Sequence, residues 1–214
     1  MTGRFRLLLA LAASPGPLAA QQLCDGAVRA PGPGGWAEYV VQAPRGQGTS
    51  TVRYAIVGSE KRGERRFVRF ETRARGTGGG SVATQVLVPG YPYEPATVQE
   101  VIVQRGTETP VRWGPSLLAR ARTAAPSALN QLIAASCTGA TLVGEEEITV
   151  PAGAFQTRHF RNAEAGSDIW ISDAVPFGVV KVAGAGGASL ELLDRGNRAQ
   201  SSVTGKPRVV NGAN

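Results

Sequence analysis

The sequence predicts a mainly β protein: one large curved antiparallel sheet of about ten strands, a half-barrel that wraps two short helices. Short runs of β-branched and aromatic residues recur along the chain, and turn-forming Gly and Pro residues separate them about every ten positions. A helical apolar pattern is confined to the region near 115–136. The 214 residues are enough for one domain with a sizeable core.

The first 20 residues have the features of a secretory signal peptide. Two arginines precede a short apolar run at 7–13, and a Pro-Gly-Pro sequence at 15–17 leads to small residues ending at Ala20. The apolar run is too short to span a membrane. We expect cleavage after Ala20 and a mature protein that is soluble in the periplasm or secreted. The alternative, a buried N-terminal helix, conflicts with the two prolines.

The net charge of the chain indicates which classes of partner it could bind. The chain carries a formal charge of +7, with more Arg than Lys. A basic exported protein can bind an anionic membrane surface or an envelope protein, although a charge of this size is also typical of an ordinary solvated surface. The sequence contains no nucleic-acid-binding motif, so we expect no nucleic acid partner.

The two cysteines, Cys24 and Cys137, are expected to pair. An exported chain with two cysteines most simply forms one disulfide bond. This bond would attach the irregular N-terminal segment to the body of the domain. The alternative is two free buried thiols. Lipid attachment at Cys24 is disfavoured because Leu23 stands where a small residue is needed.

The first half of the domain is predicted to be strands. The runs 51–57 and 64–74 alternate well and flank a polar turn, so they predict a hairpin. We interpret its Arg/Glu face as solvated. The alternative is an anion site formed by Arg65, Arg66, Arg69, Arg73 and Arg75. The predicted strands of this half are 36–43, 51–57, 64–74, 81–88 and 98–104.

Two short helices are predicted at 115–122 and 127–136. Pro115 suits a first helical turn, and Pro126 separates the two helices. Helices this short are not stable alone, so their apolar faces must pack on the sheet.

The second half of the domain is again a series of strands. The Pro-Ala-Gly-Ala sequence at 151–154 predicts a tight turn between the first two of them. From Gly196 onward the chain is polar and rich in Gly and Asn, so we expect a folded body of residues 21–196 and a disordered tail of residues 197–214. The predicted strands here are 141–150, 155–161, 168–172, 179–183 and 189–193.

Four sequence runs in this half resemble a known superfamily. They are EITVPAGAFQTRHFR (147–161), DIWIS (168–172), VPFGVVK (175–181) and SLELL (189–193). They are similar to the C-terminal half of exported bacterial proteins with a LolA/LppX-like fold. The resemblance implies a strongly curved sheet around helices, and some members carry lipids or lipoproteins across the periplasm. The matched positions are turn and core positions, so no functional residue carries over.

The sequence offers little for catalysis. His159 is the only histidine, and a Ser-His-Asp site would need an activated serine, for which no G-x-S-x-G motif is present. A zinc site needs three or four ligands, which one histidine and two paired cysteines do not supply. We therefore expect no catalytic residue, no metal and no cofactor. The consecutive Glu145, Glu146 and Glu147 alternate faces on a strand and are interpreted as solvated.

The leading hypothesis is a non-catalytic exported protein that binds or carries a lipid or another apolar ligand. A sheet this large leaves room for a cavity under its helices, although the same side chains would also fill a dry core. The second hypothesis is a cell-envelope interaction module that acts through its basic surface, and the third is a hydrolase. The ligand, the partner and the oligomeric state stay open. The predicted ligand-binding residues are Tyr54, Phe70, Trp113, Leu117, Leu118, Leu132 and Trp170.

Overall fold

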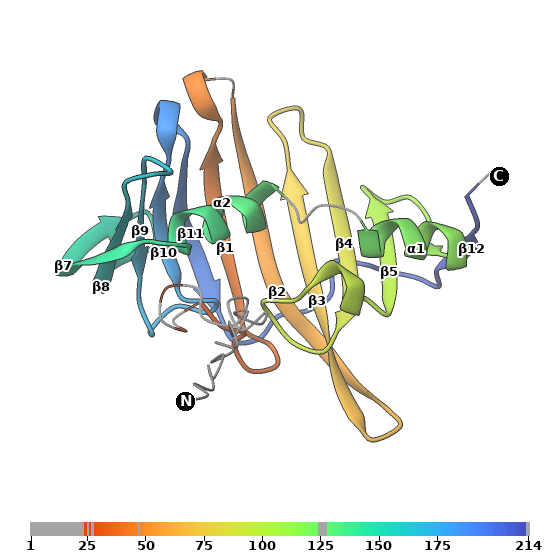
Figure 1. Ribbon diagram of the computed structural model, residues 1–214. Helices are drawn as coiled ribbons and strands as arrows, with labels where there is room; N and C mark the ends of the chain where they lie inside the picture. Colours follow the sequence, from red (N-terminus) through yellow and green to blue (C-terminus); the bar gives the residue numbers. More distant parts are fainter. Residues whose placement is uncertain (1–23, 25, 27, 47, 124–127, 213–214) are drawn as a thin grey trace, which may run out of the picture.

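The computed structural model describes residues 24, 26, 28–46, 48–123 and 128–212. Within them, twelve strands form one sheet in the order β12-β6-β5-β4-β3-β2-β1-β11-β10-β9-β8-β7 (Figure 1). The first six strands are β1 (Trp36–Gln42), β2 (Thr49–Arg62), β3 (Arg65–Arg75), β4 (Ser81–Val88), β5 (Glu100–Arg105) and β6 (Val111–Trp113). The others are β7 (Thr141–Val150), β8 (Gly153–Asn162), β9 (Ser167–Ile171), β10 (Val179–Ala183), β11 (Ser189–Gly196) and β12 (Arg208–Val210). The α-helices are α1 (Pro115–Thr123) and α2 (Ala128–Cys137), and the short 3-10 helices are η2 (Pro44–Gly46), η3 (Pro95–Thr97) and η4 (Ala185–Gly187).

The strand order results from two antiparallel meanders that meet in the middle of the sheet. β1 to β6 pair in sequence, β7 to β11 do the same, and β1 joins the two sets by pairing with β11. β7 then forms one edge of the sheet and β6 lies next to the other edge strand, β12, so the chain between β6 and β7 has to cross most of the sheet. α1 and α2 make this crossing and lie on one face (Figure 1). We call this face the concave face and the other the convex face.

The predicted fold class is confirmed. The protein is mainly β, with one large curved sheet that is antiparallel except for the last pair and is open at β12 and β7. The strands predicted at 81–88, 141–150 and 179–183 have those bounds. β6 and β12 were not predicted because three residues are too few to show an alternation. They pair with each other in parallel at the edge of the sheet.

The N-terminal segment and α2 are fastened to the sheet near its second meander. Cys24 and Cys137 form the predicted disulfide bond. Asn162 of β8 donates hydrogen bonds of 2.7 Å to the carbonyl oxygens of Ala135 and Thr138, at the end of α2. These contacts hold α2 against β8 and β9. A helix this short needs such packing because it is not stable alone.

The C-terminal segment 197–212 differs from the predicted disordered tail. It crosses the convex face behind β1 to β6 and ends in β12 (Figure 1). The backbone N–H of Ala199 donates to Gly34 O at 2.8 Å, and that of Ser202 donates to both carboxylate oxygens of Glu71 at 3.0 Å. Its composition is polar, but its order comes from hydrogen bonds to the sheet rather than from apolar burial. We call residues 197–212 the strap.

The last points about the fold are the predicted signal peptide and the possibility of a membrane-spanning helix. The predicted signal peptide, residues 1–20, lies outside the described residues. No helix in the described part of the chain has the length and apolar character needed to cross a bilayer.

Candidate functional site

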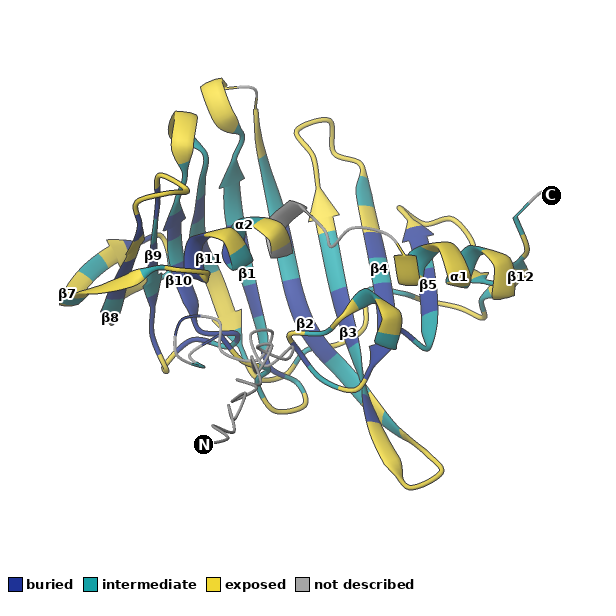
Figure 2. Cartoon of the chain, viewed as in Figure 1, coloured by how far each residue is buried: buried dark blue, intermediate teal, exposed yellow. Residues whose placement is uncertain are grey.

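The predicted ligand-binding residues fall into three separate places. Trp113 ends β6, Leu117 and Leu118 lie in the first turn of α1, and all three are half-buried. Leu132 of α2 is half-buried beside Gly184. Tyr54 of β2 and Phe70 of β3 are buried on the concave face, and Figure 2 shows buried stretches along both strands. Trp170 does not belong with the others, because the alternation of β9 places it on the convex face.

The centre of the concave face is a packed aromatic cluster rather than a cavity. The ring centroids of Tyr54 and Phe70 are 5.4 Å apart, and Tyr91 stacks on Phe70 at 5.0 Å. Phe177 adds an edge contact to Tyr91 at 5.2 Å. Aromatic pairs at these separations add to the stability supplied by burial. At Tyr54 and Phe70 the dry-core interpretation is therefore the better one.

Phe177 reaches this cluster because of its backbone. It has a φ of 67°, which a side chain larger than Gly rarely adopts. The following Gly178 closes the turn by donating its backbone N–H to Val175 O at 2.9 Å. The VPFG turn at 175–178 therefore also supplies a core side chain.

Toward the other end of the strands, the concave face is only partly covered. The main contacts of α2 are with β8 and β9, and those of α1 are with η3 and β6, so the middle strands lie between the two helices. α1 buries none of its residues. Val82 of β4 is 39% exposed, and other apolar side chains of this face are half-buried. We use the name concave trough for the apolar side chains of this face that packing leaves partly exposed, and define it by Val41, Val82, Val103, Trp113, Leu118 and Leu132.

His159 lies on the convex face in a polar cluster. Its Nδ1 is 2.9 Å from Glu146 Oε1 and its Nε2 is 2.6 Å from Asp168 Oδ1. Trp170 stacks on the ring at 4.5 Å and donates its Nε1–H to Glu146 Oε1 at 2.7 Å. Neither ring nitrogen is available to activate a nucleophile. The cluster connects β7, β8 and β9 across their strands.

The electrostatics of this cluster favour an ionised Asp168. Partial burial opposes ionisation, but the hydrogen bonds from His159 and from Arg161 Nε at 2.8 Å outweigh it and lower the pKa of Asp168 below its ordinary value. Of the glutamates predicted to be solvated, Glu146 and Glu147 have partners, the latter accepting from Gln156 Nε2 at 3.1 Å. Within the described residues, no group of three or more His, Cys, Asp or Glu side chains could hold a metal ion.

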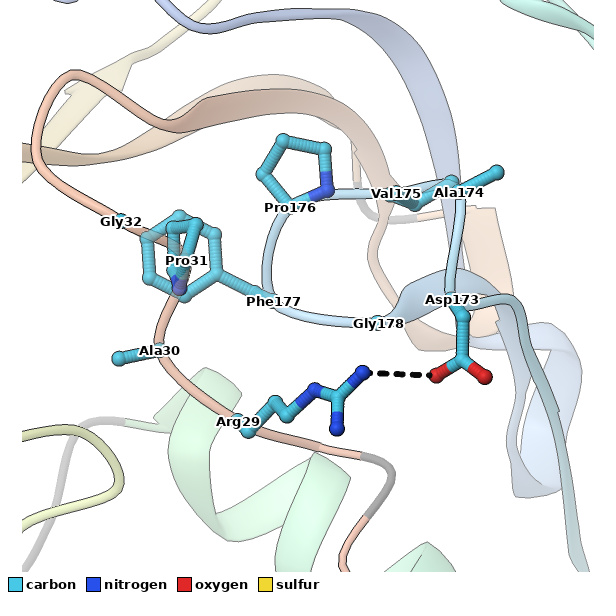
Figure 3. Close-up of a pocket in the computed structure, with 10 residues that line it drawn as sticks. All are labelled: Arg29, Ala30, Pro31, Gly32, Asp173, Ala174, Val175, Pro176, Phe177 and Gly178. Atoms are coloured by element: carbon cyan, nitrogen blue, oxygen red, sulfur yellow. Dashed lines mark hydrogen bonds and ion pairs between the residues drawn. The ribbon is translucent and has the colours of Figure 1, made fainter.

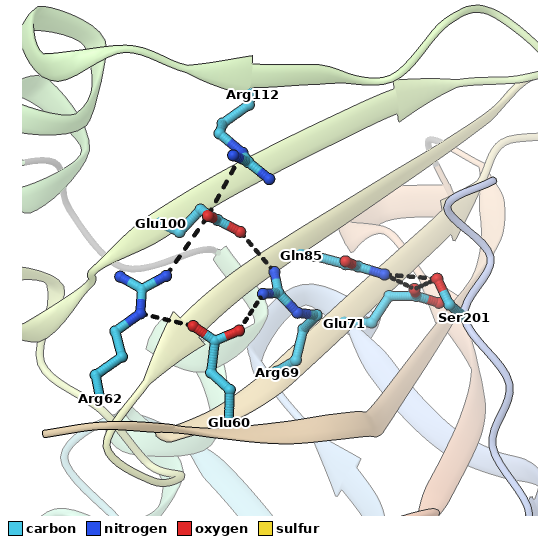
Figure 4. Close-up of polar contacts among 8 residues, drawn as sticks. All are labelled: Glu60, Arg62, Arg69, Glu71, Gln85, Glu100, Arg112 and Ser201. Atoms are coloured by element: carbon cyan, nitrogen blue, oxygen red, sulfur yellow. Dashed lines mark hydrogen bonds and ion pairs between the residues drawn. The ribbon is translucent and has the colours of Figure 1, made fainter. Parts of the chain in front are cut away.

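The convex Arg/Glu face is a network rather than a set of free charges. Arg69 donates to Glu100 at 2.7 Å and to Glu60 at 2.9 Å, and Arg62 and Arg112 complete a chain of ion pairs (Figure 4). The five arginines of the alternative anion site therefore fall into two groups, those with an acidic partner and those without one. Arg69 pairs with acidic neighbours and Arg73 lies 3.8 Å from Glu38, whereas Arg65, Arg66 and Arg75 are exposed and form no ion pair with the described residues.

Three surface clefts lie away from the predicted ligand-binding residues. One of about 380 Å³ lies between residues 29–32 and 173–178, where Arg29 pairs with Asp173 at 3.3 Å (Figure 3). A second, of about 250 Å³, shares Asp173 and Ala174 with it. A third, of about 520 Å³, lies at the base of the β2–β3 hairpin. These clefts could not be predicted from the sequence, because each is lined by segments that are separated along the chain.

Comparison with known proteins adds little to this geometry. No protein-family model matches the chain, and no curated protein matches it. Among solved structures, it is similar to a "putative lipoprotein" from Parabacteroides distasonis ATCC 8503, with 12% sequence identity over 79% of this chain and 98% of that chain. The TM-score of 0.38 is too low to carry an argument about fold or function.

Proposed function

We propose that the protein is an exported, non-catalytic binding protein that holds an apolar ligand in the concave trough. Export is supported by the signal-peptide features of residues 1–20 and by the Cys24–Cys137 disulfide, a bond that persists in oxidising compartments. The resemblance of the C-terminal half to LolA/LppX-like carriers agrees with this proposal and stays a prediction.

The observation that carries the proposal is the exposed apolar surface between the helices. Val82 lies on a strand in the middle of the sheet, yet it is 39% exposed. Trp113 and Leu118 belong to the trough and are half-buried, so a bound acyl chain would gain contacts with both. Apolar surface left open between packed elements is typical of a binding site. The packed Tyr54–Phe70 cluster limits the ligand to the trough itself.

The absence of catalysis is part of the proposal. His159, the only histidine, has a carboxylate at each ring nitrogen. A general base needs a free nitrogen within reach of the proton that it removes. A hydrolase is thus the least supported of the three hypotheses.

The test uses binding of a fluorescent fatty acid, dansyl-undecanoic acid, to the mature protein. Val82→Lys places a charge in the trough, and we expect it to weaken binding about tenfold or more, because burying an unpaired ammonium opposes an apolar ligand. The matched control is Val143→Lys, at an edge-strand valine that is 53% exposed and outside the trough. Equal affinities for both variants and the wild type would refute the site. Native mass spectrometry of protein purified from its host should also detect co-purified lipid.

A further inference from the structure

The β2–β3 hairpin extends beyond the rest of the sheet. The pairing of β2 with β1 ends at Ala55, and the pairing of β3 with β4 begins at Val68. Residues 60–67 therefore pair only with each other and form a two-stranded ribbon (Figure 1). We call residues 60–67 the ribbon. Such an extension contributes little to the core and places its side chains away from the body of the protein.

Cations face cations across the ribbon. Lys61 is directly opposite Arg66, and Arg62 is directly opposite Arg65. Like charges in directly opposite positions destabilise a strand pair. Of the four, Arg62 is compensated by Glu60 at 2.6 Å and Glu100 at 3.6 Å. The other three are exposed and form no ion pair within the described part of the chain, and neither does Glu64 at the turn.

Two of these uncompensated cations line the cleft at the base of the ribbon. Arg65 and Arg66 share this volume of about 520 Å³ with Phe67, which is 8% exposed, and with Pro89. Thr97 and Gln99 from the segment around η3 complete the lining. A guanidinium offers parallel N–H donors that match a phosphate, and Phe67 and Pro89 offer an apolar wall beside it.

We propose that the ribbon docks on an anionic bilayer and that Arg65 and Arg66, which both line its cleft, contact the phosphates of lipid headgroups. The projection of the ribbon, the like-charge pairs and the apolar wall support a lipid rather than free phosphate. The phosphate would relieve the repulsion that the folded chain leaves in place. The inference is independent of the concave trough, because the ribbon and the trough share none of their residues.

The test is co-sedimentation of the mature protein with phosphatidylcholine vesicles, with and without phosphatidylglycerol. We expect binding only to the anionic vesicles, weakening as salt is added. Arg65→Gln/Arg66→Gln should reduce partitioning roughly 30-fold, since each basic residue near an anionic surface contributes about fivefold. Thermal unfolding monitored by circular dichroism checks that the variant is folded.

The matched control is Arg75→Gln/Arg105→Gln. It removes the same charge from two exposed arginines at the opposite ends of β3 and β5 that pair with no acidic group among the described residues. It should keep partitioning within about threefold of the wild type, because charges farther than a Debye length from the surface contribute little. Equal losses in the two variants would show that net charge alone acts and would overturn the site.

A second arm separates the lipid from free phosphate. Inorganic phosphate and glycerol phosphate are titrated into the protein without vesicles and followed by heteronuclear NMR of the arginine side chains. Shifts at Arg65 and Arg66 without vesicle binding would overturn docking on a bilayer. Vesicle binding that survives in the double variant would overturn the assignment to this cleft. Binding of dansyl-undecanoic acid should be unchanged in Arg65→Gln/Arg66→Gln, which keeps this test separate from that of the trough.

Discussion

Phe70 and Glu71 are neighbours in β3 and point to opposite faces of the sheet, yet they are 2% and 1% exposed. Phe70 is covered by the rings of Tyr91 and Phe177. Glu71 is covered by the strap, and its carboxylate accepts from the Ser202 N–H and from Gln85 Nε2 at 2.8 Å. An alternation of apolar and polar residues usually indicates one buried and one solvated face.

The alternation of apolar and polar residues along β3 therefore reflects the chemistry of its two faces, and not which of them is exposed to water. The concave face excludes water with apolar rings, which are stable wherever they pack. The convex face excludes water with a polar segment, which is stable only if each buried polar group finds a partner. Gln104 illustrates the requirement, because its Oε1 accepts from the Thr204 N–H at 2.8 Å and its Nε2 donates to Glu108 O at 2.8 Å.

The largest expected loss of stability comes from a substitution in the aromatic cluster of the concave face. Phe70→Ala removes the ring at the centre of the aromatic cluster and should lower the free energy of unfolding by about 3–5 kcal/mol. Urea denaturation followed by far-UV circular dichroism measures it. Val82→Ala is the control, because its side chain is 39% exposed and should cost far less. A Phe70→Ala protein as stable as Val82→Ala would mean that the cluster is not a tightly packed core.

The next largest loss of stability is expected from a substitution beneath the strap on the convex face. Glu71→Ala leaves the Ser202 N–H and Gln85 without their acceptor and should cost about 1–3 kcal/mol. It should also make the strap, residues 197–212, susceptible to limited proteolysis. Glu191→Ala is the matched control on the same face, where a half-exposed carboxylate pairs with Lys181 at 2.7 Å, and it should cost below about 1 kcal/mol. Resistance of the strap to proteases in Glu71→Ala would contradict its anchoring role.

The smallest expected effect is a loss of stability at low pH, when Glu60 and Asp168 on the convex face become protonated. Desolvation opposes the ionisation of Glu60 and Asp168, but basic partners outweigh it and lower both pKa values: Arg62 and Arg69 for Glu60, and His159 and Arg161 for Asp168. A depressed carboxyl pKa adds stability at neutral pH, and that stability is lost as the pH falls from about 4 through the folded-state value. Both groups are partly exposed, so the loss should be below about 1 kcal/mol for each.

Urea denaturation at pH 7 and pH 3 measures this loss. Asp168→Asn should reduce the pH dependence, because an amide does not titrate. Phe70→Ala should leave it unchanged, since no carboxylate lies in the aromatic cluster. A pH dependence that is the same in Asp168→Asn and the wild type would show that Asp168 does not contribute to it.

Much of the fold could be predicted because strand signals are local. Periodicity and turn residues identified ten of the twelve strands and both helices. The pairing of Cys24 with Cys137 was predicted because an exported chain with two cysteines most simply joins them. The predicted ligand-binding set was less successful, because it joined residues by type. Trp170 is aromatic like Tyr54, but its position in β9 places it beside His159 on the other face.

The sequence by itself determined the fold class and the disulfide. It also determined the acidic-basic alternation of β3. The fold class and this alternation depend on residue types at short spacing, whereas the disulfide followed from an exported chain that has two cysteines. Only the tertiary structure decided the fate of the strap, because residues 197–212 are ordered by partners more than a hundred positions away, such as Glu71 and Gln104. It likewise decided which arginines are paired. Arg69 of β3 pairs with Glu100 of β5, on the far side of β4, whereas Arg66 lies opposite Lys61, and no local pattern distinguishes the two arginines.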